Sequence, residues 1–499
     1  MINYTPQSQL KLEFFKNPFV ENLDNNNRWI RLAAVVPWDE LASVYCRKLN
    51  SDMGRKSVDV RTVIASLIVK HKLQLDDRGV IEMIQENVYL QYFCGLQEFT
   101  TGRVFDPSLF VEIRKRLGIK EFDKFNELVI SKSEEIKPHQ SRIMNKPKKT
   151  DDNVDNPPAP NKGTLKVDAT ACDQEITYPN DVKLLNTARE KLELIIDKLY
   201  IKEIDITKPR NYRRNARRDY LNFAKKKKKS KKEIRKGVKN QLQYVRRDLD
   251  IIDRLLKKKG REVILDTADH KVMCTIRQVY KQQKEMYDKK SNRCQDRIVS
   301  IHQPHVRPIV RGKNKSKTEF GSKINVSEVG GFCRIDRLSW DTFNESKDVK
   351  QQVKNYRRLY GRYPKYFLGD QIYLTRENRK YLKSKGIIIF GKPLGRPPKH
   401  KSVSPSQRYR KKKKLAERNH IEAKFGQGKR GYGLNNIKAR LANTSESWVS
   451  SIFFVMNLLK LMEIAEKHAG FLCDFLKLHI IRIISRLNFN IHSHRFRFA

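Results

Sequence analysis

The fold is indicated first by a short extended run, GTLKVDAT at residues 163–170, in which apolar and β-branched residues lead to Asp168. Residues of this kind are typical of a strand. A second run with the same character, KYFLGD at residues 365–370, closes on Asp370. We therefore predict two strands that each end at an aspartate.

Three further strand-like runs lie between these two. They are RIVSIHQ at residues 297–303, EFGSKINVSEV at 319–329 and GFCRIDRLSW at 331–340. The pair Gly330-Gly331 separates the last two, and two consecutive glycines between strand patterns predict a β-hairpin.

The segments around and beyond the second aspartate alternate between helical and extended patterns. Helices are predicted over residues 344–360 and 375–385, and GIIIF at 386–390 reads as a short buried strand. A Pro- and Lys-rich loop is predicted at 391–414, followed by a helix over 416–425.

This element order is that of an RNase H-like domain, an α/β fold with a mixed sheet flanked by helices. In such a sheet the strands of Asp168 and Asp370 lie side by side, and Glu422 on the last helix can reach the same place. Three clustered carboxylates repel unless cations lie between them, and Mg²⁺ prefers oxygen ligands. We expect two Mg²⁺ ions, for which Mn²⁺ can substitute, to serve phosphoryl transfer there.

Residues 1–134 carry helix patterns. Helices are predicted at Val60–Leu73, from about Arg78 to Tyr89 behind a cap at Asp76-Asp77, and from Asp106-Pro107-Ser108 to near Gly118. Three short helices in succession suit a helix-turn-helix-like DNA-binding module, and a plain helical core without DNA contact fits the pattern equally well.

A linker and a basic insertion follow. Residues 135–162 are polar and contain five prolines, which indicates a domain boundary. Residues 184–297 form a helical insertion within the catalytic domain 163–462, and residues 201–260 hold 23 Lys and Arg against 7 Asp and Glu. Apolar residues spaced by three or four from Ile234 to Leu256 predict an amphipathic helix, whose seam we interpret as a dimer surface.

The composition points to a polyanion as partner. The 499 residues include 105 Lys and Arg against 56 Asp and Glu, a formal net charge of +49. No signal peptide is visible, and the longest uncharged apolar stretch, at residues 448–459, is too short to span a bilayer. Seven scattered cysteines without a C-x-x-C pair fit a reducing cytosol. Residues 463–499 read as an amphipathic tail of one or two helices.

From about residue 30 to 462 the sequence resembles the DDE transposases of bacterial insertion sequences, of the insertion-sequence-5 type. The resemblance is carried by long motifs: KSVDVRTVIASLIVKHKLQLDDRGVIEMIQENVYLQYFCGLQEF, FDPSLFVEIRKRLG, KVDATACDQEITYPNDVKLLNTARE, DRIVSIHQPHVRPIVRGK, FGSKINVSEVGGFCRIDRLSWDTFNES, GDQIYLTRENRKYLKSKGI and RNHIEAKFGQGKRGYGLNNIKARLANTSESWVSSIFFVMNL. Motifs of this length make the match specific.

The resemblance implies roles for particular residues. Asp168, Asp370 and Glu422 match the family's metal-binding triad, and Arg418 and Lys429 match basic residues thought to hold DNA near the scissile phosphate. Where the related motif often has a tyrosine, this chain has Leu415, so any contact by that tyrosine is missing or comes from Tyr409.

Other polar residues compete for these roles. We interpret four acids as structural because none combines a strand end with a place in the matched motif, and three histidines as ordinary because they lack ligand spacing: Asp173, Asp181, Asp336, Asp341, His302, His305 and His420. Two lysine runs are candidate DNA contacts: Lys225, Lys226, Lys227, Lys228, Lys229, Lys411, Lys412, Lys413 and Lys414.

We therefore predict a cytoplasmic, nucleoid-associated transposase that binds terminal inverted repeats and target DNA as a homodimer and does not engage a membrane. Water would attack the phosphodiester at the element end, and the freed 3′-hydroxyl would attack the target. Two alternatives are a non-catalytic DNA-binding protein derived from a transposase, and a stand-alone nuclease. A nuclease would not need the N-terminal helices or so long a basic insertion.

Overall fold

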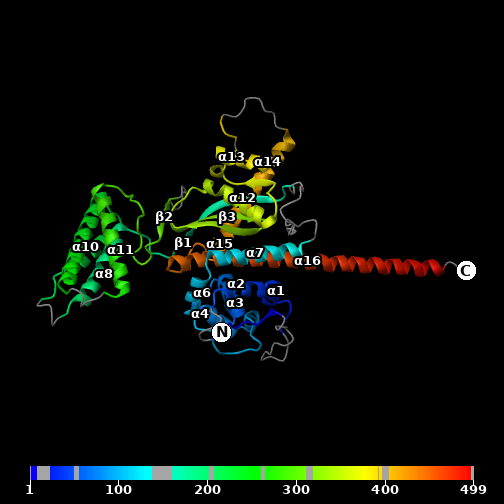
Figure 1. Cartoon of the computed structure of the whole chain (residues 1–499), viewed down its shortest axis with the longest axis horizontal. Coiled ribbons are helices and arrows are strands. Elements are labelled where there is room, and N and C mark those ends of the chain that lie inside the picture. Colours follow the sequence, from blue (N-terminus) through cyan, green and yellow to red (C-terminus); the bar gives the residue numbers. More distant parts are fainter. Residues whose placement is uncertain are drawn as a thin grey trace, which may run out of the picture.

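A computed structural model gives the fold as a mixed α/β arrangement (Figure 1). It describes residues 2–7, 23–49, 56–137, 160–201, 207–259, 265–310, 318–391, 393–395 and 404–495, with side chains in the last helix as far as residue 468. The predicted α/β class is confirmed. Most of the predicted linker, and part of the loop after residue 391, lie outside the described residues.

A mixed sheet holds the centre of the chain. Its strands run in the order β2 (Arg307–Val310), β3 (Thr318–Val329), β1 (Thr164–Asp173), β5 (Tyr366–Leu368) and β6 (Ile388–Ile389), and β4 (Phe332–Ser339) also pairs with β3. The β1–β5 and β5–β6 pairs are parallel, whereas β3 is antiparallel to β1, β2 and β4. The strand before Asp370 therefore lies beside the strand of Asp168, as predicted.

The hairpin between β3 and β4 is confirmed. Gly330 and Gly331 both have positive φ, 60° and 94°, which residues with a Cβ rarely adopt. By contrast, the strand predicted at residues 297–303 is wrong. That segment has no strand structure, and β2 begins only at Arg307. Its apolar residues Ile298 and Ile301 are buried against the helical insertion, which explains the misleading pattern.

Strand β1 is longer than predicted. It continues for five residues beyond Asp168, because β3 pairs with it as far as Asp173. Side chains alternate across a strand, so Leu165 and Val167 point to one face and Asp168 to the other. Leu165 packs beside Tyr356 on the face covered by α12 (Val349–Tyr360), whereas α15 (Asn419–Gly431) contacts β1 from the other side.

The elements after the hairpin match the predictions with two corrections. A short 3₁₀ turn, η5 (Glu345–Asp348), leads into α12, η6 (Gln371–Tyr373) follows β5, and α13 (Arg376–Ser384) precedes β6, whose Ile388 is 46% exposed rather than buried. The loop predicted to reach residue 414 ends earlier. Helix α14 (Pro405–Glu417) begins at Pro405 behind the cap Ser404, so the second lysine run lies on a helix.

The N-terminal helices pack on the same core as the sheet. The cluster of buried apolar residues extends from Leu23 to Ile464 without a break between them. The helices predicted at residues 60–73 and near residue 109 are confirmed, whereas the second is divided in two at Asn87. The bounds are α1 (Arg28–Val35), α2 (Trp38–Cys46), α3 (Val60–Leu73), α4 (Asp77–Glu86), α5 (Val88–Phe93), α6 (Leu109–Arg116) and α7 (Ile119–Ile136).

Helix α16 (Ala442–Arg495) joins the N-terminal helices to the sheet (Figure 1). Its segment Ala442–His468 is long and apolar enough to cross a membrane by length and composition, but 67% of its most apolar window is buried within the protein. The polar residues of this stretch have partners there. Asn457 bonds to the backbone of Cys333 in β4, and Ser451 to His71 in α3, at 2.6 Å. The stretch is therefore a core helix, as predicted, and α16 continues as a single helix through the predicted tail.

The basic insertion forms a separate helical bundle (Figure 1, green). It consists of α8 (Asp181–Leu199), α9 (Arg213–Lys225), α10 (Lys231–Lys259) and α11 (Thr267–Asp288) and has its own hydrophobic core. The apolar seam predicted on α10 is present, but Val245 and Ile252 are fully buried against the neighbouring helices. The interpretation of this seam as a dimer surface is therefore wrong.

Candidate functional site

The register of the parallel pair β1–β5 places two acidic residues opposite each other. Lys166 pairs with Leu368, so Asp168 and Asp370, each two residues further along, occupy equivalent positions at the carboxyl end of β5. Asp168 lies within β1 rather than at its end, which corrects the prediction. It does lie where the parallel pairing ends, and this position brings the two aspartates together.

A tight turn positions Asp370. Its side chain caps η6 by accepting a hydrogen bond from Gln371 N at 2.8 Å. A Cβ on Gly369 would lie 2.9 Å from Val167 Cγ2, so only glycine allows β5 to leave the sheet this close to β1. Behind the turn, buried Tyr373 donates a 2.8 Å hydrogen bond to Asn325 of β3. Sequence reasoning missed these supporting residues, although the Gly-Asp pair was a usable signal.

Helix α15 supplies the third carboxylate. Glu422 lies in the first turn of α15, where the helix dipole stabilises a negative charge. Arg418, at the junction of α14 and α15, contacts Glu422 Oε1 at 3.0 Å through Nη2 and Asp370 Oδ1 at 3.1 Å through Nη1. A single guanidinium therefore bridges the second and third acids of the predicted triad.

Asp168 is the least exposed of the three. Burial raises the pKa of its carboxyl, and Glu422 and Asp370 add to the rise. The Ala169 N–H, which donates to Asp168 Oδ1 at 2.8 Å, and the Arg418 guanidinium oppose it. These mutual effects show that the three carboxylates and Arg418 form one electrostatic cluster.

The donor set of this cluster suits a hard divalent cation. All three side chains offer carboxylate oxygens, and a positive group already lies on two of them. In the described part of the chain, no three His, Cys, Asp or Glu side chains are grouped closely enough to hold a metal ion. Because Arg418 lies between Asp370 and Glu422, the three carboxylates would have to move closer together, and Arg418 away from them, to bind one.

Lys429 lies on the same side of α15 as Glu422, because seven residues complete about two helical turns, roughly 10 Å along the axis. Its Nζ is 3.8 Å from Glu319 Oε1 of β3, a loose ion pair. Neither Lys429 nor Arg418 is fully exposed, with 22% and 27% of their side chains accessible. The structure thus aligns both predicted basic residues with Glu422.

Helix α14 leads directly into this cluster and has no buried residue. Lys411, Lys412 and Lys413 are exposed, whereas Lys414 is half-buried over the ring of Tyr366 and pairs with Glu417. Because α14 is strongly basic and has no apolar face, it does not pack against the core along its length. It presents its cations to solvent next to Arg418.

The other lysine run belongs to the bundle. Lys225 ends α9, and Lys226 to Lys229 lie in its connection to α10. Lys226 pairs with Glu233 at 2.6 Å, and Lys229 lies over the ring of Phe223. The core of the bundle is distinct from the core that carries the triad, so the structure does not bring this run to the carboxylates.

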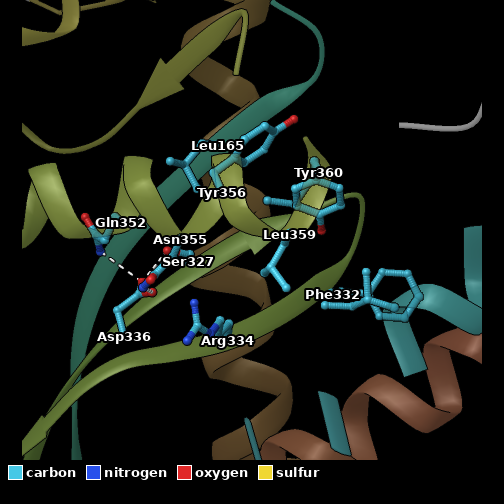
Figure 2. Close-up of a pocket in the computed structure, with 12 residues that line it drawn as sticks. Leu165, Ser327, Phe332, Arg334, Asp336, Gln352, Asn355, Tyr356, Leu359 and Tyr360 are labelled. Carbon is cyan, nitrogen blue, oxygen red and sulfur yellow. Dashed lines mark hydrogen bonds between the residues drawn. The ribbon is translucent and has the colours of Figure 1, made fainter. Parts of the chain in front are cut away.

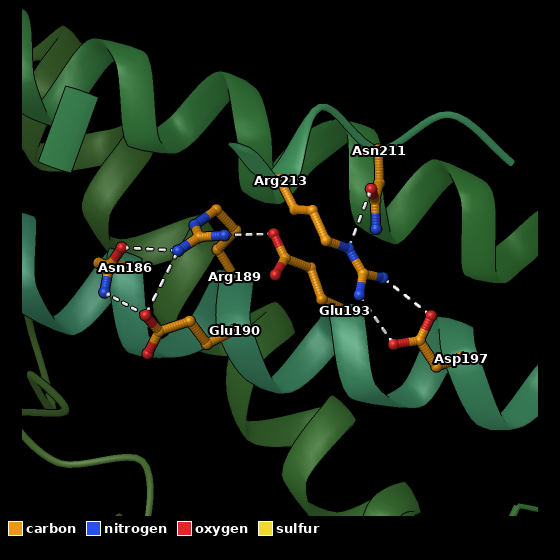
Figure 3. A network of polar contacts seen from close by, with 7 residues as sticks. All are labelled: Asn186, Arg189, Glu190, Glu193, Asp197, Asn211 and Arg213. Carbon is orange, nitrogen blue, oxygen red and sulfur yellow. Dashed lines mark hydrogen bonds and ion pairs between the residues drawn. The ribbon is translucent and has the colours of Figure 1, made fainter. Parts of the chain in front are cut away.

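Ion pairs inside the bundle serve its own structure (Figure 3). Arg213 makes a double contact with Asp197, at 2.8 and 2.9 Å, which lowers the pKa of that carboxyl. Arg189 is only 1% exposed and pairs with Glu193. Burial raises the pKa of the Glu193 carboxyl in spite of this pairing. These ion pairs connect turns of α8 and the start of α9. Part of the high charge density of the bundle is therefore used in its own ion pairs and does not require DNA as a partner.

The N-terminal helices differ in what they can present to DNA. Helix α3 buries twelve of its fourteen residues and cannot enter a groove. In α4, Asp77 is bound by both Arg114 and Lys70 at 2.8 Å, and the exposed residues include Glu82 and Glu86. Any DNA contact by this module must therefore come from residues outside α3.

Two of the competing acids have structural surroundings. Asp336 is enclosed between β4 and α12, beside a cavity of about 20 Å³ (Figure 2), where burial raises its pKa to about 6. It accepts hydrogen bonds from Ser327, Gln352 and Asn355. Elsewhere, Asp181 pairs with Arg297 at 2.6 Å.

Two segments of the chain are similar to known transposase domains. Residues 367–459 match the family model described as transposase DDE domain, and residues 18–116 match the model described as transposase domain (DUF772). The first match includes Asp370 and Glu422, whereas Asp168 lies outside both, so its assignment depends on the β1–β5 register.

One curated relative is the uncharacterized protein ORF8 in the nfe locus of Rhizobium meliloti, which is 31% identical over 111 residues. The match spans 22% of this chain and 52% of that protein, so the chain covers about half the length of the relative. No solved structure matches the chain.

Proposed function

Because the two family matches identify the chain as a DDE transposase of insertion sequences, we propose that it binds the terminal inverted repeats of such an element, cuts the DNA there and joins the end to a target. The observation that supports this most is the register of β1 and β5, which makes Asp168 and Asp370 neighbours. Glu422 completes the set through its contact with Arg418. The sheet around them is proposed to act as an RNase H-like core.

Asp168, Asp370 and Glu422 would hold two Mg²⁺ ions, or Mn²⁺ in their place. Such ions activate a water or 3′-hydroxyl and stabilise charge on the phosphorus oxygens. The turn at Gly369 and the cap at Asp370 fix one carboxylate, and strand β1 fixes another. This rigid support is what phosphoryl transfer requires, since misplacement of a reacting group by 1 Å can cost about a hundredfold in rate.

Arg418 changes partners in this proposal. Its guanidinium must release Asp370 and Glu422 when they serve as metal ligands, and it then has two N–H faces available for a phosphate. Lys429 lies about two turns along the same side of α15 and can contact a second phosphate of the same strand. Both residues would position DNA and not transfer protons.

The remaining basic surfaces would hold DNA at longer range. Helix α14 places the run 411–414 beside the site, and the α9–α10 connection places the run 225–229 on the bundle. The N-terminal helices would recognise the terminal repeats. We propose a homodimer at the bacterial nucleoid, because two element ends must be held in one complex.

The test is strand cleavage of a labelled duplex that carries the element's terminal repeat, in Mg²⁺, by the wild type and by Asp370→Asn. This substitution preserves size and removes one metal-binding charge. We expect cleavage at the repeat boundary by the wild type, none by the variant, and equal DNA binding by both. Tight binding without cleavage by either protein, in Mg²⁺ or Mn²⁺, would contradict the proposal and favour a non-catalytic DNA-binding protein.

A further inference from the structure

A basic depression lies on α12 and α13, away from the carboxylates. It has a volume of about 550 Å³. Four cations and two tyrosines line it, and no acidic residue does: Lys354, Arg357, Arg358, Lys385, Tyr363 and Tyr381. Arg358 is neutralised by an ion pair with Glu127 of α7.

Three of these cations have no acidic partner among the residues that the structure describes. Lys354, Arg357 and Lys385 are all exposed, and the contacts found for Arg357 and Lys385 are with Tyr363. Arg357 donates to the Tyr363 hydroxyl at 3.1 Å. Three unneutralised cations around one depression attract an anion that carries several charges.

The tyrosines indicate which anion fits. Arg357 and Lys385 both lie over the ring of Tyr363, at 5.0 and 5.7 Å from its centre. Because two cations already lie over the Tyr363 ring, this ring is not available to stack on an unpaired base. Proteins usually bind single-stranded DNA through such stacking. The arrangement therefore favours contacts with the phosphate backbone of duplex DNA.

The depression lies at the opposite end of the strands from the triad. Tyr363 precedes β5, and its loop pairs with the segment just before β1, since the Lys162 N–H donates to Tyr363 O at 3.1 Å. Asp370 follows β5 and lies seven residues after Tyr363. Seven extended residues span at most about 23 Å. Helix α12 also covers the face of β1 opposite to the one that carries Asp168.

A duplex bound at the carboxylates cannot reach this depression without bending around the sheet. The two sites lie on opposite faces and at opposite ends of β5, and duplex DNA is stiff over about 150 base pairs, so such a bend is costly. We propose that the depression formed by Lys354, Arg357, Lys385 and Tyr363 binds the backbone of a second DNA duplex, other than the one being cut. This inference rests on the proposed function, because strand transfer brings two duplexes together.

The test measures capture of a second duplex by the full-length protein in metal-free buffer, where no cutting occurs. A duplex carrying the terminal repeat is immobilised, and a labelled duplex of unrelated sequence is added at a series of salt concentrations. The depression variant combines Lys354→Glu, Arg357→Glu and Lys385→Glu. The matched control combines Lys347→Glu, Lys380→Glu and Lys383→Glu, which change the net charge equally on neighbouring exposed positions outside the depression.

We expect the depression variant to bind the immobilised repeat as the wild type does and to capture at least tenfold less of the second duplex. The slope of log affinity against log salt should fall by about 2.7, which is about 0.9 for each phosphate that the variant no longer neutralises. The control should remain within about twofold of the wild type. Equal capture by the depression variant, or an equal loss in the control, would overturn the inference.

Two additional experiments distinguish loss of DNA binding from disturbed folding and from binding of a small anion. Glutamine versions of the same three substitutions repeat the test in case the glutamates disturb folding. Calorimetric titration with tripolyphosphate tests a small free anion as the ligand, and tight binding in the depression together with unchanged DNA capture would overturn the inference. Cleavage of the repeat in Mg²⁺ is scored separately, so its failure in the wild type would count against the proposed function and not against the depression.

Discussion

The chain contains two clusters of carboxylates and arginines that differ mainly in exposure. At the end of β5, the side chains of Asp370 and Glu422 are 62% and 51% exposed and share Arg418. Inside the bundle, Asp248 of α10 is fully buried, neither of its oxygens has a hydrogen-bond partner, and burial, with Glu193 nearby, raises its pKa to about 8.

This difference in exposure distinguishes a candidate functional site from a cluster that stabilises the fold. In the proposed function, the exposed cluster would exchange its arginine for a metal ion and offer that arginine to DNA, because water can solvate every intermediate arrangement. The buried cluster cannot exchange its partners, because each unpaired charge in the interior is costly. In the proposed function, similar residues would therefore serve catalysis in one place and structure in the other.

The largest expected effect concerns the exposed cluster. Asp168→Asn and Glu422→Gln should each reduce cleavage of the repeat by about three orders of magnitude or more, and the double variant should be no worse, because the carboxylates act as a unit. The measurement is single-turnover cleavage in Mg²⁺. Asp341→Asn, at a 73% exposed acid outside the cluster, should cut normally, and additive losses would show that the carboxylates act separately.

A smaller effect should follow from changing the turn that supports Asp370. Gly369→Ala would place a Cβ 2.9 Å from Val167 and 3.3 Å from Tyr373 Cβ, which must displace the aspartate. We expect cleavage to fall by about ten- to a hundredfold with little loss of DNA binding. Gly431→Ala is the control, since its Cβ would meet nothing within 4 Å. Equal rates for both variants would show that the turn is not needed.

Removing the arginine of the exposed cluster should favour the metal. Arg418→Gln eliminates both ion pairs, so Mn²⁺ should bind the protein without DNA about three- to tenfold more tightly. In the same variant, affinity for the repeat should fall, because one cation that would bind a phosphate is removed. Titration calorimetry gives both constants. Weaker Mn²⁺ binding by the variant would show that Arg418 supports the metal site instead of competing for it.

The buried cluster should respond to pH and not to metal. Asp248 keeps its proton in the folded protein up to about pH 8, whereas the unfolded chain loses it near pH 4, so the free energy of unfolding should fall as the pH rises through this window. Asp248→Asn cannot lose a proton and should be more stable by about 1–3 kcal/mol near pH 8.

Thermal denaturation at about pH 6 and pH 8 tests this difference. Asp250→Asn, at an exposed position on the same helix, is the matched control and should follow the wild type. Identical pH dependence of the wild type and Asp248→Asn would mean that the carboxyl is ionised and solvated in the folded protein.

Much of the fold follows from local patterns. The glycine pair at 330–331 predicted the hairpin, and the apolar spacing of residues 60–73 predicted α3 with its correct bounds. Where strand length depends on a distant partner, prediction failed. Strand β1 passes Asp168 because β3 pairs with it, and nothing near Asp168 in the sequence shows this.

The candidate site was predictable only in its parts. Asp370 and Glu422 stood out in recognisable motifs, but the bridge made by Arg418 depends on the junction of α14 and α15. That junction was misplaced because a run of lysines was read as a loop, although Ser404 and Pro405 carry an ordinary helix-start signal. Gly369 shows its importance only once Val167 is seen beside it.

The central claim is that Asp168, Asp370 and Glu422 form one metal site. The most direct measurement is Mn²⁺ binding to the wild type and to the three single variants Asp168→Asn, Asp370→Asn and Glu422→Gln, followed by electron paramagnetic resonance with the repeat duplex present. We predict that the wild type binds Mn²⁺ and that each variant weakens this binding by about tenfold or more. Unchanged binding in any one of the three would remove that residue from the site and contradict the claim.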